Sequence, residues 1–515
     1  MLTDNTTGDR ASHCERNAAL AVICLGVAIR LWVRVPTDFW EDEFIAATHA
    51  MQPFGRLLIN IVRNDVHPPL FFLQLHVWSL LGQSDVWLKL NSVLWSLVAL
   101  GSLWWTANRL YGSRTALLAT AIFAILPSPA YMADQLRMYA MLATLIIWAF
   151  YFASITFGSG NRSRKNLVWL TILLIAICNT HAIGAIAVFS NGIYALSLIL
   201  VRPRPERSFK PWLLIYGIAA VSAAPWIVTS IVHDANLSVW NGIPGFITAL
   251  SATTLGQVAF QQPFLRAPGA AVWLGIVAFG LASRRSRAAA LAFLLLPLLL
   301  ATAAEFAHKP LFKWNVFSTM AAPFLALLLA RGLEKSGSRT LPLLSAGCTL
   351  ALLALCIDTR LTVRESEGYR ALTDLIRANY KPGDIVYAPQ PSVFGGLAWY
   401  LEGPRWGSPL EIAAKPSPQW RKVYDKLGPE LVGILGLEPK TQFIRGKNVT
   451  LLVGNGSADQ AKGASRVWLV VVSRADLAPG YPPADLNGLQ PRWSRRDRLW
   501  TILYASSPHE TVKTR

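Results

Sequence analysis

Long apolar stretches alternate with short polar connections up to about residue 357. A helix needs about 20 apolar residues to cross a bilayer, and eleven stretches approach or reach that length. They cover residues 17–35, 86–108, 113–132, 139–157, 167–179, 182–201, 211–232, 268–283, 288–306, 316–330 and 340–357. The pattern predicts an α-helical polytopic membrane protein with about 11 crossings plus juxtamembrane helices. The polar tail at 1–16 leads into an apolar run without a small-residue cleavage site, so we expect a retained first crossing.

The pattern changes after residue 358. An amphipathic segment at 368–380 predicts a helix, and short apolar runs at 385–389, 449–453, 466–473 and 499–505 predict strands between Gly- and Pro-rich turns. One helix followed by short strands indicates a small α/β domain at 359–515. We therefore expect a tail at 1–16, a transmembrane domain at 17–358 with an external loop at 36–85, and this C-terminal domain.

The composition agrees with a membrane protein. Hydrophobic residues make up 53% of the chain and charged residues 15%, where soluble domains carry about 25%. A formal net charge of +19 is also typical of nucleic-acid-binding proteins, but here much of the basic charge lies in short clusters between the apolar stretches, as membrane topology requires. The last 150 or so residues contain no cysteine, so neither a disulfide framework nor a zinc site is expected there.

The basic clusters fall in every second connection, which the positive-inside rule assigns to the cytoplasm. They lie at 109–114, 162–165, 202–210, 284–287 and 331–339. The alternation requires that 67–82, which is short for a crossing, lies in the interface or forms a half-helix. The N-terminus is then cytoplasmic, and the C-terminal domain is external.

The predicted external side holds several candidate site residues. Glu41, Asp42 and Glu43 follow the first crossing, and a carboxylate at a membrane face can act as a general base. The alternative is that these acids simply begin a helix, where negative charge is favourable. His67, before Pro68 and Pro69, could hold a phosphate or a metal, or could only mark a helix start.

Basic groups on the same predicted side favour a phosphate ligand. Arg137 lies at the rim of a predicted crossing, where it could pair with a lipid-borne phosphate or only reach toward ordinary lipid. His181 lies in a tight turn, and Lys313 lies in a short loop with Lys309. The sequence contains no Walker loop, HExxH or GxSxG motif, so nucleotide-driven, zincin and serine-hydrolase chemistry receive no support.

The order of these motifs resembles a known family. Trp40-Glu41-Asp42-Glu43, His67-Pro68-Pro69-Leu70, Arg137-Met138-Tyr139-Ala140 and Thr180-His181, followed by an external C-terminal domain, resemble bacterial membrane glycosyltransferases of the C superfamily. The most similar branch is family 39, the protein-mannosyltransferase-like enzymes, which includes aminoarabinose and galacturonosyl transferases. The resemblance covers roughly residues 38–330.

The resemblance implies an inverting glycosyltransferase of the bacterial inner membrane. Such an enzyme transfers a sugar from a polyprenyl-phosphate carrier to lipid A, a polysaccharide or a protein on the periplasmic face. It implies Asp42 as the catalytic base. It further implies substrate or phosphate contacts for Glu43, His67, Arg137, Tyr139, His181 and Lys313.

Metal use stays open in the sequence. A divalent ion could be held by residues from the set Asp42, Glu43, His67 and Asp134, but no complete ligand set can be identified. Two positions depart from the family pattern: Gln135 stands where the family often has Glu, and Lys313-Trp314-Asn315 stands where an Arg-Tyr pair is frequent.

Two other functions fit the same crossings. A transporter of lipid-linked sugars or solutes, or a scaffold with a sensor domain, would more often place charges at mid-membrane. A polysaccharide polymerase or ligase would share the compartment and use a longer donor.

Overall fold

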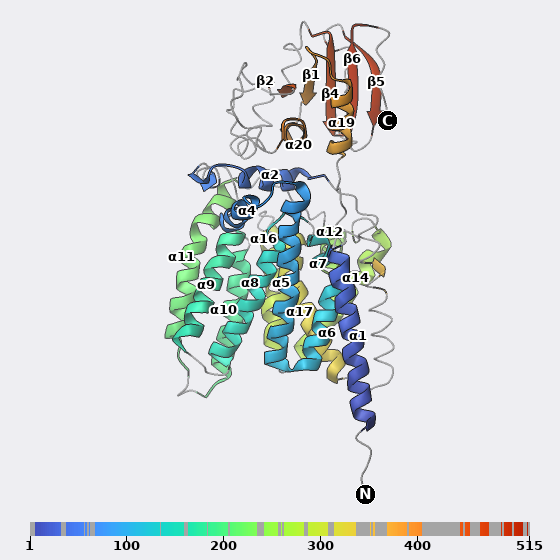
Figure 1. Cartoon of the computed structure of the whole chain (residues 1–515). Helices are drawn as coiled ribbons and strands as arrows, with labels where there is room; N and C mark the ends of the chain where they lie inside the picture. The colour runs from blue at the N-terminus through green and yellow to red at the C-terminus, as the bar shows by residue number, and fades with distance from the viewer. Residues whose placement is uncertain are drawn as a thin grey trace. The chain divides into compact units, whose positions relative to one another are not determined.

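The structure is a computed structural model of the whole chain (Figure 1). The residues it describes are 6–31, 38–55, 57–58, 61, 67–133, 135–158, 163–182, 184–203, 207–233, 242–255, 259, 262–282, 287–306, 314–335, 351, 354–355, 368–388, 391–403, 443–445, 449–453, 464–472, 486, 489–496, 499–507 and 512.

The chain forms two compact units. The helical unit comprises Met1–Arg34, Val66–Phe71 and Lys89–Val363, and the mixed unit comprises Val35–Asp65, Phe72–Leu88 and Arg364–Arg515. Most of the predicted external loop at 36–85 therefore groups with the C-terminal residues, a grouping that chain order does not reveal.

The helical unit follows the apolar stretches closely. Its helices are α1 (Thr6–Leu31), α5 (Asp85–Tyr111, from Lys89 on), α6 (Ser113–Ile125), α7 (Pro127–Met132), α8 (Tyr139–Ala153), α9 (Arg164–Thr180), α10 (Gly184–Val201), α11 (Lys210–His233), α12 (Gly242–Leu255), α14 (Arg266–Ala282), α15 (Arg287–Ala290), α16 (Leu296–Phe306) and α17 (Trp314–Lys335). The π-helical turns Ser154–Gly158 and Leu291–Leu295 extend α8 and join α15 to α16. Helix α12 was not predicted, and most of the stretch at 340–357 lies outside the described residues.

Five helices within the described part of the chain are long and apolar enough to cross a membrane. They are Asp85–Tyr111, Tyr139–Gly158, Gly184–Val201, Lys210–Val228 and Val316–Glu334. The prediction of a helical membrane protein is thereby confirmed, while the number of eleven crossings and their orientation stay predictions.

Helix α17 lies at the centre of the helical unit, with 83% of its apolar window buried. Phe324 of α17 stacks on Phe293 with ring centroids 3.9 Å apart, and Phe150 of α8 meets both rings edge-on. Edge-to-face and stacked pairs of this kind add to the free energy of burial. They fix α8 and α17 as the rigid support for the residues at their ends.

Helix α1 approaches α6 unusually closely. A side chain on Gly26 would collide with Ala124, because its Cβ would lie 2.4 Å from the alanine Cβ. The close approach lets the buried Arg30 donate to the carbonyl oxygens of Ala124 and Phe123 and to the Ser96 hydroxyl. Arg30 thus joins α1, α5 and α6.

The mixed unit contains α2 (Glu41–Ala50), most of α4 (Leu70–Ser79), α19 (Tyr369–Asn379), α20 (Pro391–Glu402) and a six-stranded sheet. The strands are β1 (Ile385–Ala388), β2 (Phe443–Arg445), β3 (Thr450–Val453), β4 (Arg466–Val472), β5 (Gln490–Arg496) and β6 (Leu499–Ala505), in the order β2-β3-β1-β4-β6-β5. β1 runs parallel to β3 and β4, and the other pairs are antiparallel. At ten residues, α4 is about 15 Å long and too short to cross, as expected for 67–82.

Candidate active site

Helix α2 begins with the acidic residues in two different environments. The Glu43 side chain is buried, and its carboxylate accepts a hydrogen bond of 3.3 Å from the backbone N–H of Trp40, the residue that precedes the helix. Asp42 is only partly buried in the same first turn. Glu43 therefore caps the helix, which was the structural alternative for the acids, while Asp42 remains accessible.

Buried side chains on the inner side of α2 fix its position. Phe44, Ala47 and Ala50 are fully buried, and α2 lies against α20 in the mixed unit. A helix held along its length keeps the backbone of its first turn, which carries Asp42, in one place. Asp42 thus has the setting that a positioned base requires.

A second group of predicted residues comes together in the helical unit, and we call His67, Arg137, Tyr139 and His181 the arginine–histidine cluster. An N–H of the Arg137 guanidinium lies 3.1 Å from Nε2 of His67. The His67 and His181 rings meet edge-on with centroids 5.2 Å apart, and the Tyr139 ring lies 6.4 Å from that of His181. Four residues that span 115 positions of sequence thus meet at one place.

Local structure explains how each member of the cluster is placed. His67 precedes Pro68 and Pro69 at the start of α4, Arg137 lies in the turn before α8, Tyr139 opens α8, and His181 ends α9. The Ser92 hydroxyl donates to the carbonyl oxygen of Arg137 at 3.4 Å, so α5 supports the same turn. The four side chains of the cluster are therefore positioned by the ends of helices α4, α8 and α9.

The chemistry of the pair defines its protonation. Arginine is always charged and can only donate hydrogen bonds, so Nε2 of His67 must accept the bond from Arg137. This requires the neutral imidazole with its proton on Nδ1. Arg137 is 4% exposed, and a buried guanidinium next to a neutral imidazole favours an anion such as a phosphate.

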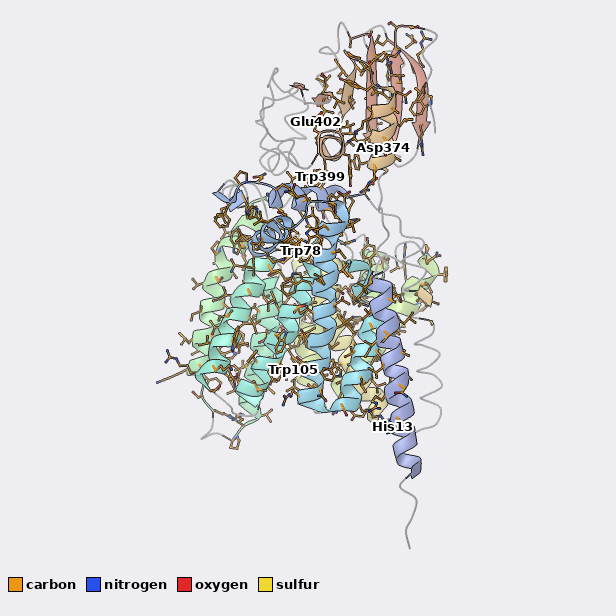
Figure 2. All side chains as sticks on the ribbon, in the orientation of Figure 1. His13, Trp78, Trp105, Asp374, Trp399 and Glu402 are labelled. Carbon is orange, nitrogen blue, oxygen red and sulfur yellow. The ribbon has the colours of Figure 1, made fainter. Side chains whose placement is uncertain are left out.

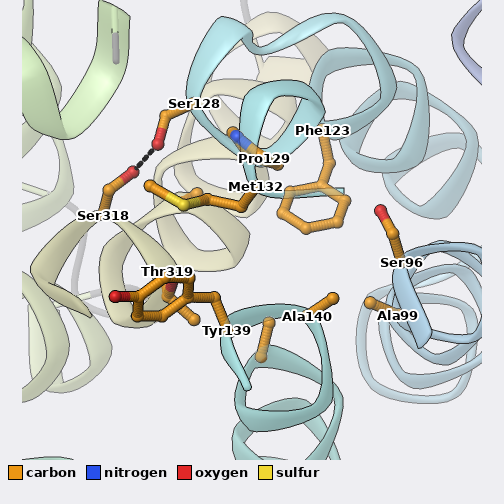
Figure 3. Close-up of a pocket in the computed structure, with 12 residues that line it drawn as sticks. Ser96, Ala99, Phe123, Ser128, Pro129, Met132, Tyr139, Ala140, Ser318 and Thr319 are labelled. Atoms are coloured by element: carbon orange, nitrogen blue, oxygen red, sulfur yellow. Dashed lines mark hydrogen bonds between the residues drawn. The ribbon is translucent and has the colours of Figure 1, made fainter. Parts of the chain in front are cut away.

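A small hollow adjoins the cluster at Tyr139 (Figure 3). Its walls combine apolar side chains such as Phe123 and Met132 with the hydroxyls of Ser96, Thr319 and Tyr139. The Ser128 and Ser318 hydroxyls hydrogen-bond across α7 and α17.

The described residues do not fit a resident metal ion. They contain no group of three or more His, Cys, Asp or Glu side chains placed to hold one. Nε2 of His67, which could coordinate a metal, instead faces the positively charged Arg137. Asp134 and Lys313 lie outside the described residues. Gln135, two positions before Arg137, is buried.

The predicted residues thus separate into two sets. His67, Arg137, Tyr139 and His181 belong to the helical unit, and Asp42 and Glu43 belong to the mixed unit.

Sequence reasoning missed a third set, in the mixed unit, which we call the Arg370 network: Asp38, Asp85, Arg370 and Tyr400. The Arg370 guanidinium lies 2.6 Å from Asp85 and 3.4 Å from Asp38. The Tyr400 hydroxyl donates to Asp85 at 2.6 Å and accepts from the backbone N–H of Phe39 at 2.8 Å. Asp85 at the start of an apolar stretch resembles an ordinary helix cap, so only the fold shows its partners.

Electrostatics in the Arg370 network raise the pKa of both Tyr400 and Arg370. Burial and the neighbouring Asp85 carboxylate raise the pKa of Tyr400 well above its ordinary value, so the phenol stays a hydrogen-bond donor. Burial lowers the pKa of Arg370, but Asp85, Tyr400 and Asp38 outweigh it and raise that pKa above its usual value.

Comparison with solved structures identifies the architecture. ArnT from Cupriavidus metallidurans in the apo state superimposes with a TM-score of 0.59 at 15% identity, covering 97% of this chain and 99% of that one. The same protein bound to undecaprenyl phosphate gives a TM-score of 0.57 at 14% identity, with coverage of 96% and 98%. The chain shares the ArnT fold.

This likeness in fold agrees with the resemblance noted in the sequence. The agreement extends over nearly the full length of both chains, including the C-terminal residues. No protein-family model matches the sequence, and a search of curated proteins finds no significant match.

Proposed function

We propose that the protein is an inverting glycosyltransferase that moves a sugar from a polyprenyl-phosphate carrier to an acceptor hydroxyl or amine at the periplasmic face of the inner membrane. Lipid A, an envelope polysaccharide or a protein would supply the acceptor. The arginine–histidine cluster carries the proposal, because a buried cation beside a neutral imidazole suits the phosphate of such a donor. The fold shared with ArnT, one structure of which holds undecaprenyl phosphate, supports it.

The proposed reaction needs one base and one group of cations. Asp42 takes the proton of the acceptor as the acceptor atom attacks the anomeric carbon of the sugar. The bond between that carbon and the phosphate oxygen breaks, and its electron pair leaves with the polyprenyl phosphate. Attack opposite to the leaving group inverts the anomeric configuration.

The cluster would act on the leaving group. Charge develops on the phosphate as the glycosidic bond breaks, and Arg137, oriented by His67, stabilises that charge more strongly in the transition state than in the ground state. A phosphate leaving group stabilised in this way needs no strong general acid. Each role is assigned within its own unit, from Asp42 at the start of α2 and from the cluster at the ends of α4, α8 and α9.

Replacement of the proposed base gives the direct test. In membranes supplied with labelled polyprenyl-phosphate sugar and an envelope extract, we expect Asp42→Asn to lower transfer about 10²- to 10⁴-fold, the usual range for loss of a general base. Asp374→Asn is the matched control, because Asp374 is an exposed acid of α19 in the same unit (Figure 2). Full transfer by a folded Asp42→Asn protein would remove Asp42 as the base.

The same assay separates the other candidate functions. A transporter would move the labelled lipid across the membrane without product formation, and a polymerase or ligase would require a long saccharide on the carrier. Mass spectra of lipid A, polysaccharide and secreted protein, with and without this protein, identify the acceptor.

A further inference from the structure

The segment that leads into α2 is held by the last third of the chain. Asp38 and Phe39 lie immediately before α2, and their partners Arg370 and Tyr400 come from α19 and α20. We propose that Arg370 and Tyr400 are positioning residues: they fix the start of α2 and, through it, the carboxylate of Asp42. This inference rests on the proposed role of Asp42 as the base.

Two contacts fix the backbone directly. The Asp38 carboxylate accepts the backbone N–H of Arg370 at 2.9 Å, while its other oxygen lies 3.4 Å from the guanidinium. One residue on, the Phe39 N–H donates to the Tyr400 hydroxyl at 2.8 Å. The Phe39 ring is fully buried and lies 5.6 Å from the Trp399 ring, centroid to centroid, so side chain and main chain are held by the same helix.

Asp85 completes the arrangement from a third segment of the unit. Its carboxylate faces the Arg370 guanidinium at 2.6 Å, the Tyr400 hydroxyl at 2.6 Å and the Trp399 indole N–H at 3.4 Å (Trp399 is labelled in Figure 2). Two carboxylates share one guanidinium, and the neutral donors Tyr400 and Trp399 supply the remaining hydrogen bonds. Asp38 and Asp85 are 2% and 9% exposed, and buried charges of this kind are costly unless every partner is present.

Few residues of the chain separate the Arg370 network from the proposed base. Only Phe39, Trp40 and Glu41 separate Asp38 from Asp42, and the Trp40 N–H is held by Glu43. The first turn of α2 is thus tied to the network at successive residues. A base displaced by about 1 Å can lose about 100-fold in rate, so the network can govern turnover without touching the substrate.

Arg370→Gln in the full-length protein, purified in lipid nanodiscs, tests the proposal. We expect kcat to fall about 10- to 100-fold, with the KM for the lipid-linked sugar changed less than about twofold, because binding of the donor does not involve the network. Amide hydrogen exchange of residues 41–50 should accelerate at least about tenfold, while exchange in β4 and β6 stays at the wild-type rate. Tyr400→Phe, which removes one hydroxyl, should give a smaller change of the same kind.

Arg492→Gln is the matched control, since Arg492 is an exposed arginine on β5 of the same unit, and it should leave both measurements unchanged. Unaltered kcat and exchange in Arg370→Gln would overturn the proposal. Equal acceleration across α2 and the sheet would also overturn it, because the network would then serve stability alone. Hydrogen exchange needs no substrate, so a wild-type protein without transfer activity would refute the proposed function and leave the positioning test intact.

Discussion

Arg137 and Arg370, one in each unit, differ in the groups that they contact. Arg137 of the helical unit meets the neutral imidazole of His67, whereas Arg370 of the mixed unit meets the carboxylates of Asp38 and Asp85. A guanidinium flanked by two carboxylates already has its counter-charge and serves to hold segments together. A guanidinium beside a ring nitrogen can also bind an anion such as a phosphate through its N–H groups. We therefore propose a binding role for Arg137, whereas Arg370 holds segments of the mixed unit together.

Of the two arginines, Arg137 is expected to give the larger effect. Arg137→Gln keeps a hydrogen-bond donor for His67 but removes the positive charge. We expect the rate of sugar transfer to fall about 10²- to 10³-fold, the usual loss when an enzyme loses a hydrogen-bond donor that stabilises the charge of the transition state. Initial rates with labelled lipid-linked sugar measure it, against Arg109→Gln, an exposed arginine of α5 in the same unit. The comparison fails if Arg137→Gln loses less activity than Arg370→Gln.

Asp384 and Arg466 form a second contact between a carboxylate and a guanidinium in the mixed unit. This buried carboxylate accepts from the Trp468 indole and from the Lys381 backbone at 3.0 Å each, and it lies 3.5 Å from the buried Arg466. We expect Asp384→Ala to lower the unfolding free energy of the mixed unit by about 3–5 kcal/mol, because Arg466 is left buried without this partner. Tryptophan fluorescence during denaturation measures the change, and Asp374→Asn is the exposed control. A loss below about 1 kcal/mol would show that the contact between Asp384 and Arg466 contributes little to the free energy of unfolding.

The smallest effect concerns Tyr400 at alkaline pH. The folded state binds the phenolic proton more tightly than the unfolded chain, because burial and Asp85 raise the pKa of Tyr400. Its contribution is therefore complete below the unfolded pKa of about 10 and declines above it, by up to about 1.4 kcal/mol per pH unit. The free energies of unfolding of wild type and Tyr400→Phe, plotted against pH, should run parallel from pH 6 to 9 and converge above about pH 10. Curves that stay parallel above pH 10 would show that the Tyr400 hydroxyl does not stabilise the folded state through Asp85.

The sequence predicted the elements whose pattern is local. Strands β1, β3, β4 and β6 lie within the short apolar runs, and the predicted helix at 368–380 contains α19. Strand β5 was missed because QPRWSRR is polar and lies at the exposed edge of the sheet. Helix α20 was missed because Gly395 and Gly396 look like a turn, whereas a Cβ on Gly396 would lie 2.4 Å from the Tyr369 ring.

The candidate residues were predicted from motif order, and their contacts were not. Nothing in the periodicity of the chain places Arg137 against His67, 70 residues away, or separates Glu43 as the cap from Asp42 as the accessible acid. The Arg370 network could not be predicted from the sequence at all, because Arg370 and Asp85 are 285 residues apart and neither belongs to a motif.

The contact between Asp38 and Arg370 also sets an order for synthesis. The two residues lie 332 positions apart, and at about 5 to 20 residues per second the ribosome needs roughly 15 to 65 seconds to pass from one to the other. During that interval α2 exists without α20, its later partner, although α4 is already made, and His76 of α4 lies 2.8 Å from the Ala50 carbonyl oxygen. A nascent chain that ends before residue 370 therefore carries the proposed base on a helix that lacks Arg370 and Tyr400, the residues proposed to position it.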